Sequence, residues 1–222
     1  MATPPEHIIF HSRGKQLAIL SNFCPHRLSI DGHVFSCGEA YFHFAKFRAA
    51  ASVHAAGTEP ATQARHRALL GHASKLADAS LSGLAAKRLG GKGPQGMRLE
   101  TDELSAWDAA RDDTQRRLCD ARTNQGDEAK QVRSALRESG DAVLVHFERG
   151  ARPDTYWGGK VVDAGTPNVR IVGRNTLGRM WMEVRQRLKS VAETDGPQAH
   201  DTAEAREVTA CPKRHRPEST MP

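Results

Sequence analysis

The chain has 222 residues, of which 38% are apolar, and this length suits one medium-sized domain or one domain followed by a tail. A formal net charge of +6 favours anionic partners such as nucleotides and nucleic acid, and a basic surface that only keeps the protein soluble fits the same charge. No stretch approaches the ~20 apolar residues of a membrane helix, and residues 1–5 lack the features of a signal peptide, so we expect a cytoplasmic protein without membrane association.

Short strands are expected near the start of the chain. The apolar run at 7–10 is typical of a strand. Two alternating runs at 26–30 and 33–35 flank Asp31 and Gly32, and an Asp-Gly pair in this position is a good signal for a β-hairpin. This region therefore predicts one strand followed by a hairpin.

The apolar period then changes to that of a helix. Across 37–51, apolar residues such as Phe42 recur at helical spacing, and Ala is frequent. A break at 57–60 ends this helix, and 61–89 supplies further helical sequence rich in Ala and Leu. The segment 90–96, GGKGPQG, contains too much Gly for regular structure and predicts a flexible loop.

The second half begins with helices. Thr101, followed by two acidic residues, is typical of a helix start. The segment 103–138 predicts one or two amphipathic helices with a break near 123–126. A strand is expected at 142–147 and a loop at 149–159.

The chain is expected to end in a helix and a tail. Residues 175–189 carry an apolar stripe at helical spacing, which predicts a packed helix. After residue 190 large apolar side chains nearly vanish, so the segment 190–222 cannot bury enough surface to offset its ordering entropy. We therefore expect 190–222 to be disordered.

The helix that begins near residue 37 is the richest segment for chemistry. Four of its residues fall on one face, at positions i, i+3, i+4 and i+7: Glu39, Phe42, His43 and Lys46. A carboxylate can transfer protons, and a lysine with a lowered pKa can attack a sugar aldehyde as a Schiff-base nucleophile. Two solvated surface charges would show the same spacing, so both interpretations stay open.

Residues outside this helix are further candidates. Asp154 and Trp157 share a loop, where an aromatic ring beside a carboxylate suits base stacking next to proton transfer, and a turn-forming Asp gives the same pattern. Trp107 is either a packing residue or a ligand stacker. Ser21 and Asn22 either cap local structure or hold a ligand hydroxyl.

No metal or cofactor is expected. The histidines show no HxH or HExxH spacing, and the four cysteines form neither a CxxC pair nor a zinc pattern. Free thiols of this kind are typical of a reducing cytoplasm.

Five motifs follow one another in a recognisable order. Residues 20–25 read LSNFCP, and 39–47 read EAYFHFAKF. Residues 154–159 read DTYWGG, 175–185 read NTLGRMWMEVR, and Trp107 lies between the two pairs. In this order they resemble the NADAR (YbiA-like) N-glycosidase family, whose corresponding motifs are LSNF-x-P, EHYFQAQKF, D-x-x-WG-x-G and N-x-LG-x-x-LM-x-VR, with an aromatic residue after a Gly-rich loop.

The resemblance covers about residues 8–189 and implies a compact, mainly helical α+β domain with a small β-sheet, followed by the tail over 190–222. It implies an N-glycosidase without a cofactor, in which Glu39 is an acid/base, Lys46 engages ribose C1, and Asp154 assists proton transfer or holds the ribose. It also implies a set of substrate-binding residues: Ser21, Asn22, Phe23, Tyr41, Trp107, Trp157, Gly158 and Asn175.

The substrates that the resemblance implies are ribosylated nucleobases. The first is ADP-ribosylated guanine in nucleic acid or nucleotides, from which ADP-ribose would be released, with DNA or RNA carrying ADP-ribose as the partner. The second is the class of phosphoribosylamino-pyrimidine intermediates of riboflavin synthesis. An antitoxin-like protein that reverses nucleic-acid ADP-ribosylation would use the basic surface to dock on DNA.

The chain also departs from the family pattern. Ala40 replaces a His, Gly91 replaces an Arg, and His146 replaces a Glu in the strand before the Asp154 loop. These departures leave a further hypothesis open, a catalytically weak module that binds ADP-ribose or a nucleotide.

Overall fold

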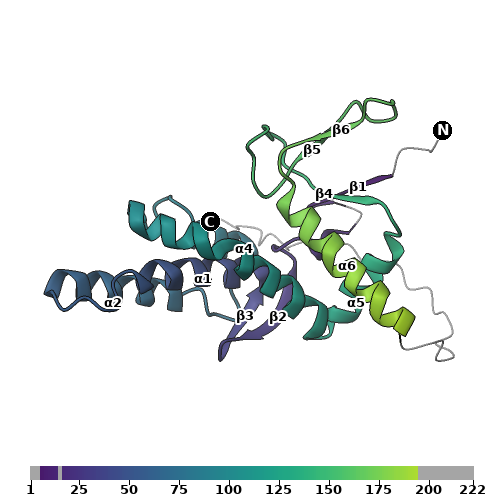
Figure 1. The fold of residues 1–222 in the computed structure, drawn as a ribbon. Coiled ribbons are helices and arrows are strands. Elements are labelled where there is room, and N and C mark those ends of the chain that lie inside the picture. Colours follow the sequence, from purple (N-terminus) through teal and green to yellow (C-terminus); the bar gives the residue numbers. More distant parts are fainter. Residues whose placement is uncertain (1–5, 15–16, 195–222) are drawn as a thin grey trace, which may run out of the picture.

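The structure is a computed structural model that describes residues 6–14 and 17–194 (Figure 1). These residues form the expected α+β fold, in which helices dominate. In chain order the elements are β1 (His7–Phe10), the 3₁₀ turn η1 (Ala18–Leu20), β2 (Pro25–Ile30), β3 (His33–Cys37), α1 (Gly38–Ser52), α2 (Pro60–Ser74), α3 (Gly83–Gly90), α4 (Thr101–Asn124), α5 (Glu128–Glu138), β4 (Val143–His146), β5 (Lys160–Val162), β6 (Arg170–Val172) and α6 (Thr176–Thr194).

The strands of the described residues pair two by two. β2 and β3 form the predicted hairpin, with Asp31 and Gly32 at its turn, where their φ angles are +54° and +76°. β1 pairs with β4 in parallel, with Phe10 beside His146. β5 and β6 form an antiparallel hairpin, which projects from the body of the domain in Figure 1.

Helix α1 is the centre of a first core. It packs against α2, α3 and α4, and its buried face carries Phe44 and Phe47. Phe35 of β3 meets Phe44 edge-on at a ring separation of 5.1 Å, which joins the hairpin to this core. Burial of such side chains stabilises the packing by about 25 cal/mol per Å² of apolar surface.

A second core joins β1, β4, α5 and α6. Phe10, Leu144 and Trp181 are fully buried in it. The indole Nε1 of Trp181 donates a hydrogen bond of 3.0 Å to the Leu20 carbonyl, and the buried Arg122 guanidinium donates to the same oxygen at 3.1 Å. Because Leu20 ends η1, these bonds fix the residues that follow it.

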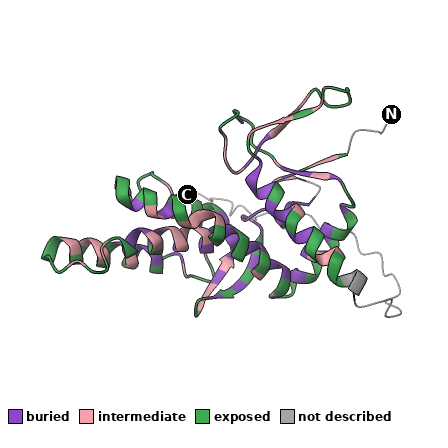
Figure 2. Cartoon of the chain, viewed as in Figure 1, coloured by how far each residue is buried: buried purple, intermediate pink, exposed green. Residues whose placement is uncertain are grey.

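Helix α4 belongs to both cores. Leu118 packs in the first core and Cys119 in the second. Burial raises the pKa of the Cys119 thiol to about 12, so this cysteine is a packing residue and not a nucleophile. Figure 2 shows buried residues along α1, α4 and α6, whereas the far end of α2 and the β5–β6 hairpin are half-buried or exposed.

The structure adds detail to one predicted segment and differs from the predicted elements in two places. The helical sequence 61–89 forms two helices, because a turn around Asp78, whose Oδ1 accepts the Ser80 N–H at 2.8 Å, separates α2 from α3. The sequence predicted neither β5 nor β6. Helix α6 continues to Thr194, so 190–194 are helical, and the rest of the expected tail, 195–222, lies outside the described residues.

None of the helices in 6–14 and 17–194 is long and apolar enough to span a membrane.

Candidate active site

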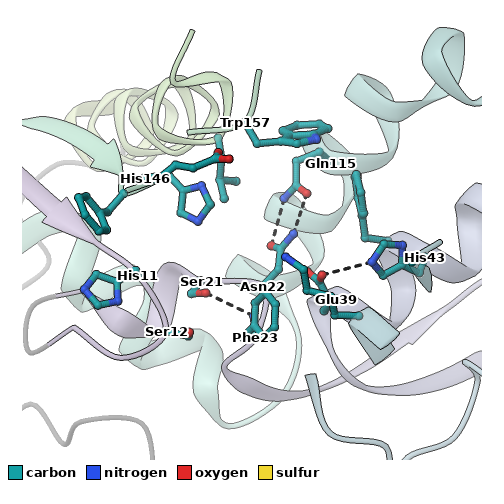
Figure 3. Close-up of a pocket in the computed structure, with 16 residues that line it drawn as sticks. His11, Ser12, Ser21, Asn22, Phe23, Glu39, His43, Gln115, His146 and Trp157 are labelled. Atoms are coloured by element: carbon teal, nitrogen blue, oxygen red, sulfur yellow. Dashed lines mark hydrogen bonds and ion pairs between the residues drawn. The ribbon is translucent and has the colours of Figure 1, made fainter. Parts of the chain in front are cut away.

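A pocket of about 510 Å³ lies between the two cores (Figure 3). Its wall comes from segments that are far apart in the sequence: the loop after β1, the segment between η1 and β2, α1, the end of α3, α4, the end of β4, the loop before β5 and the start of α6. The site therefore depends on the whole fold.

Helix α1 supplies a carboxylate to this pocket. Glu39 lies in the first turn, and its backbone N–H donates to the Asn22 carbonyl at 2.8 Å, which ties the helix start to the segment before β2. Its side chain is 11% exposed, and its Oε1 lies 3.2 Å from Nε2 of His43, one turn further along α1. A helix N-terminus favours negative charge, so the position suits an ionised carboxylate.

Two amides form a buried pair in the wall. Asn22 donates to the Gln115 side-chain oxygen at 2.9 Å, and Gln115 donates back to Asn22 at 3.3 Å. Next to them, the Ser21 hydroxyl oxygen accepts the Phe23 N–H at 3.4 Å. Paired amides have a fixed orientation, and their remaining donor and acceptor positions can bind ligand hydroxyls.

Aromatic side chains line the pocket beside the carboxylate. Phe42 of α1 and Trp157 meet edge to face, with ring centroids 5.3 Å apart and an interplanar angle of 87°. Trp107 of α4 packs against Phe42 at 4.8 Å, and Tyr156 packs against Trp157 at 5.0 Å. Rings held in this way provide apolar faces on which a planar base can stack.

The end of β4 forms the other side of the pocket, where His146 lies across from Glu39 in Figure 3. Asn175 holds this strand, because its Oδ1 accepts the His146 N–H at 3.0 Å and its Nδ2 donates to the Leu144 carbonyl at 2.8 Å. Gly158 approaches the same backbone so closely that an added Cβ would lie 2.7 Å from the His146 carbonyl oxygen. Asn175 and Gly158 therefore support the site through the backbone.

The structure brings five of the residues predicted for the site together at the pocket: Ser21, Asn22, Phe23, Glu39 and Trp157. Three more support that wall without lining it: Trp107, Gly158 and Asn175. The remaining three do not line the pocket: Lys46, Asp154 and Tyr41.

Lys46 lies one turn beyond His43 on the same face of α1, and its ammonium donates to the Gly90 carbonyl at 2.6 Å. Gly90 covers His43 so closely that an added Cβ would lie 2.0 Å from the imidazole. Burial lowers the pKa of Lys46, and the charge of Lys92 lowers it further. The amine is therefore held by the end of α3 rather than exposed in the pocket.

Asp154 and Tyr41 have different surroundings. Asp154 is exposed in a turn that the Thr155 N–H closes onto the Arg152 carbonyl at 3.0 Å. Tyr41 is buried in the first core, edge-on to Phe35 at 5.4 Å. Because it follows Glu39 by two positions, Tyr41 lies on another face of α1.

Sequence reasoning missed several pocket residues. Gln115 is one polar residue in a mostly polar helix, and its partner Asn22 lies 93 positions away, so no local spacing marks the pair. His11 and Lys87 also line the pocket, and neither belongs to a recognisable motif. His146 is marked in the sequence only by its departure from the family pattern.

Within the part of the chain that the structure describes, no group of three His, Cys, Asp or Glu side chains is arranged to hold a metal ion. The cysteines of this part, Cys24, Cys37 and Cys119, are all buried.

The fold is similar to that of a solved protein, the E. coli protein YbiA, whose structure was determined by NMR. The TM-score is 0.52 at 23% sequence identity, and the match covers 90% of this chain and 94% of that chain. The protein is therefore an α+β protein with the YbiA-like fold.

A sequence comparison defines the family. Residues 9–189 match the NADAR domain, and the chain belongs to the NADAR family. This family is associated with N-glycosidase activity. No curated protein sequence matches the chain significantly.

Proposed function

We propose that this protein is an N-glycosidase that hydrolyses the C–N bond between ribose and a nucleobase, and that it releases ADP-ribose from ADP-ribosylated guanine in nucleic acid or nucleotides. One observation carries this proposal: the Glu39 carboxylate lines the same pocket as the Phe42–Trp157 aromatic pair. The association of the NADAR family with N-glycosidase activity supports the reaction class.

The chemistry of the bond matches these groups. Cleavage of a glycosidic bond develops positive charge on the sugar, and here it also releases a planar base. A partly buried carboxylate stabilises that charge more strongly than a carboxylate in water, and His43 fixes the position of Glu39. Stacking on aromatic rings contributes about 1–3 kcal/mol for a base.

The rest of the ligand also has candidate partners. Ser21 and the Asn22–Gln115 pair offer hydrogen bonds to ribose hydroxyls. The Lys87 ammonium, 5.3 Å from the centroid of the Phe23 ring at the pocket wall, offers a positive charge to the phosphates of ADP-ribose.

A second candidate function is an ADP-ribose or nucleotide binding module with little turnover. The observation that favours it is the position of Lys46 and Asp154, two of the three residues expected to be catalytic, outside the pocket wall. The same aromatic and amide groups would bind the ligand without cleaving it.

The test is ADP-ribose release from a DNA oligonucleotide that carries ADP-ribose on guanine. We expect the wild-type protein to release ADP-ribose and Glu39→Gln to lose this activity. Glu59→Gln, at an exposed position before α2, is the matched control and should remain active. If contacts to DNA phosphates contribute, activity will fall steeply as salt rises.

Other outcomes redirect the proposal. No release from the wild-type protein would exclude this substrate, and the phosphoribosylamino-pyrimidines would be assayed in the same format. Intact substrates of both kinds, together with measurable ADP-ribose binding, would establish the binding module in place of the enzyme.

A further inference from the structure

Hydrolysis of a C–N bond needs a group that takes a proton from the attacking water, and this group must line the pocket. The described residues of the pocket wall include six ionisable side chains: His11, Glu39, His43, Lys87, His146 and Glu148. Glu39 is already placed opposite the positive charge of the ribose, so the proton acceptor is sought among the other five.

Four of these five are poorly suited to the task. His43 is bonded to Glu39 at 3.2 Å, and Nδ1 of His11 accepts the Arg13 N–H at 3.2 Å. Lys87 is a cation and has no lone pair to offer. Glu148 is exposed at the pocket edge, where water surrounds its carboxylate.

His146 has the opposite properties. Its Nδ1 is buried and has no hydrogen-bond partner in the described structure. Nδ1 of His43 is also unpartnered, but Gly90 covers it so closely that an added Cβ would lie 2.2 Å away. Its backbone is fixed by Asn175 at 3.0 Å. Because Nδ1 has no partner, the hydrogen bond of the ring to the Trp157 carbonyl falls on Nε2, which fixes the ring and leaves the Nδ1 lone pair unused.

The electrostatic surroundings keep this imidazole neutral at physiological pH. Burial lowers the pKa of His146, and the charges of Lys87 and His11 lower it further. The Trp157 carbonyl and the Glu39 carboxylate act in the other direction without reversing the shift. A neutral imidazole has the lone pair that a proton acceptor needs.

We propose that His146 is the catalytic base of the pocket and accepts a proton from the water that attacks the ribose carbon. This inference rests on the proposed N-glycosidase function and adds a residue to it. His146 and Glu39 then work from opposite sides of the pocket, one on the water and the other on the charge of the sugar (Figure 3).

In this step the water oxygen forms a bond to the ribose carbon as the bond from that carbon to the base nitrogen breaks. The electron pair of the broken bond goes to the nitrogen, which takes up one proton from solvent. The water gives one proton to His146, which returns it to solvent. Water is the only co-reactant consumed.

The experiment compares His146→Gln with the wild-type protein in the oligonucleotide assay. Gln keeps hydrogen-bonding groups and loses the basic nitrogen, so we expect kcat to fall about 100-fold or more. The pKa of His146 is lowered from 6.5, so the ring stays neutral down to that pH and becomes protonated only at a lower pH. The wild-type rate should therefore decline only below pH 6.5, where the ring loses its free lone pair. His146→Gln should lack this decline.

Controls separate chemistry from packing. ADP-ribose binding, measured by calorimetry, should stay within about threefold of the wild-type Kd in His146→Gln. Added imidazole should restore part of the rate of His146→Ala, because it supplies the missing base in the vacated space. His7→Gln, on β1 and outside the pocket wall, is the matched histidine control and should keep the wild-type rate and pH profile.

The outcomes distinguish the two proposals. An active wild-type protein with a His146→Gln rate within threefold of it would overturn the role of His146 and leave the N-glycosidase intact. A slower variant that keeps the wild-type pH profile and gains nothing from imidazole would also overturn it. A wild-type protein that cleaves no N-glycoside would remove both proposals together.

Discussion

Two helices of this protein carry a buried glutamate near their start, each beside a histidine, and the two carboxylates are bonded very differently. Glu39 of α1 lines the pocket, and the described structure gives it one side-chain partner, His43 at 3.2 Å. Glu103 of α4 is fully buried, with Arg65 donating to its two oxygens at 2.7 and 2.6 Å and His54 at 2.8 Å.

The bonds of Glu103 leave it no capacity for a ligand. It also accepts the Glu100 N–H at 2.8 Å, which completes a capping box at the start of α4. Burial raises the pKa of Glu103, but the hydrogen bonds from Arg65, the Glu100 backbone and His54 outweigh it and lower the pKa to about 2. Burial alone therefore does not distinguish the two carboxylates, whereas only Glu39 has unused bonding capacity beside a cavity, which is what its proposed role requires.

The largest expected effect comes from neutralising Glu39. Glu39→Gln keeps the size of the side chain and removes its charge, so we expect turnover to fall about 1,000-fold, or about 4 kcal/mol in the barrier. The free energy of unfolding should change by less than about 1 kcal/mol. Single-turnover ADP-ribose release and urea unfolding measure the two quantities, and a destabilised but active variant would reverse the roles of the two glutamates.

The corresponding change at α4 should have the opposite consequence. Glu103→Gln leaves the Arg65 guanidinium without its carboxylate, so we expect a loss of about 3 kcal/mol in the free energy of unfolding. Activity per folded molecule should stay at the wild-type level, because Glu103 does not line the pocket. Urea unfolding checks the first statement, with Glu59→Gln as the reference, and an unchanged midpoint would contradict it.

The Glu103 pKa also predicts how stability depends on pH. A carboxyl whose pKa falls from 4.5 to about 2 on folding stabilises the protein above pH 4.5 and loses this contribution as the pH falls towards 2. The contribution is about 3 kcal/mol. Urea unfolding between pH 2 and 6 should show that the free energy of unfolding depends less on pH in Glu103→Gln than in the wild-type protein. The same pH dependence in both proteins would contradict the lowered pKa of Glu103.

Lys46 gives the smallest expected effect. Lys46→Met keeps most of the stem and loses the 2.6 Å bond to Gly90, which loosens the cover over His43. We expect about a tenfold lower turnover, with the exposed Lys75→Met as control, and no adduct when substrate is treated with borohydride. A trapped adduct on Lys46 would show instead that the amine leaves Gly90 and attacks the ribose.

Local sequence signals predicted much of the fold. The Asp31-Gly32 pair predicted the hairpin, because few residues adopt the positive φ angles of such a turn. The helical period around Phe42 predicted α1, and the break near 123–126 predicted the division between α4 and α5. β5 and β6 were missed because three-residue strands carry too few side chains to show a period.

The candidate site was predictable only where it lies on such a local pattern. Helical spacing put Glu39 and Lys46 on one face of α1. The same spacing contains no information on the end of α3, which binds Lys46 through the Gly90 carbonyl and leaves Glu39 at the pocket. Gln115 and His146 reach the pocket through long-range packing. No local pattern marks Gln115, and His146 is marked only by its departure from the family pattern.

The position of the pocket between two cores also affects how the protein would unfold. A bound ligand would contact Glu39 on the side of the first core and Trp157 at the edge of the second. Local unfolding of either core would then break the site and lose the free energy of ligand binding. At a concentration 100 times its Kd, such a ligand adds about 2.7 kcal/mol to global stability. Ligand binding should therefore slow amide hydrogen exchange in α1 and α6 to the same extent. The two cores would then unfold as one cooperative unit.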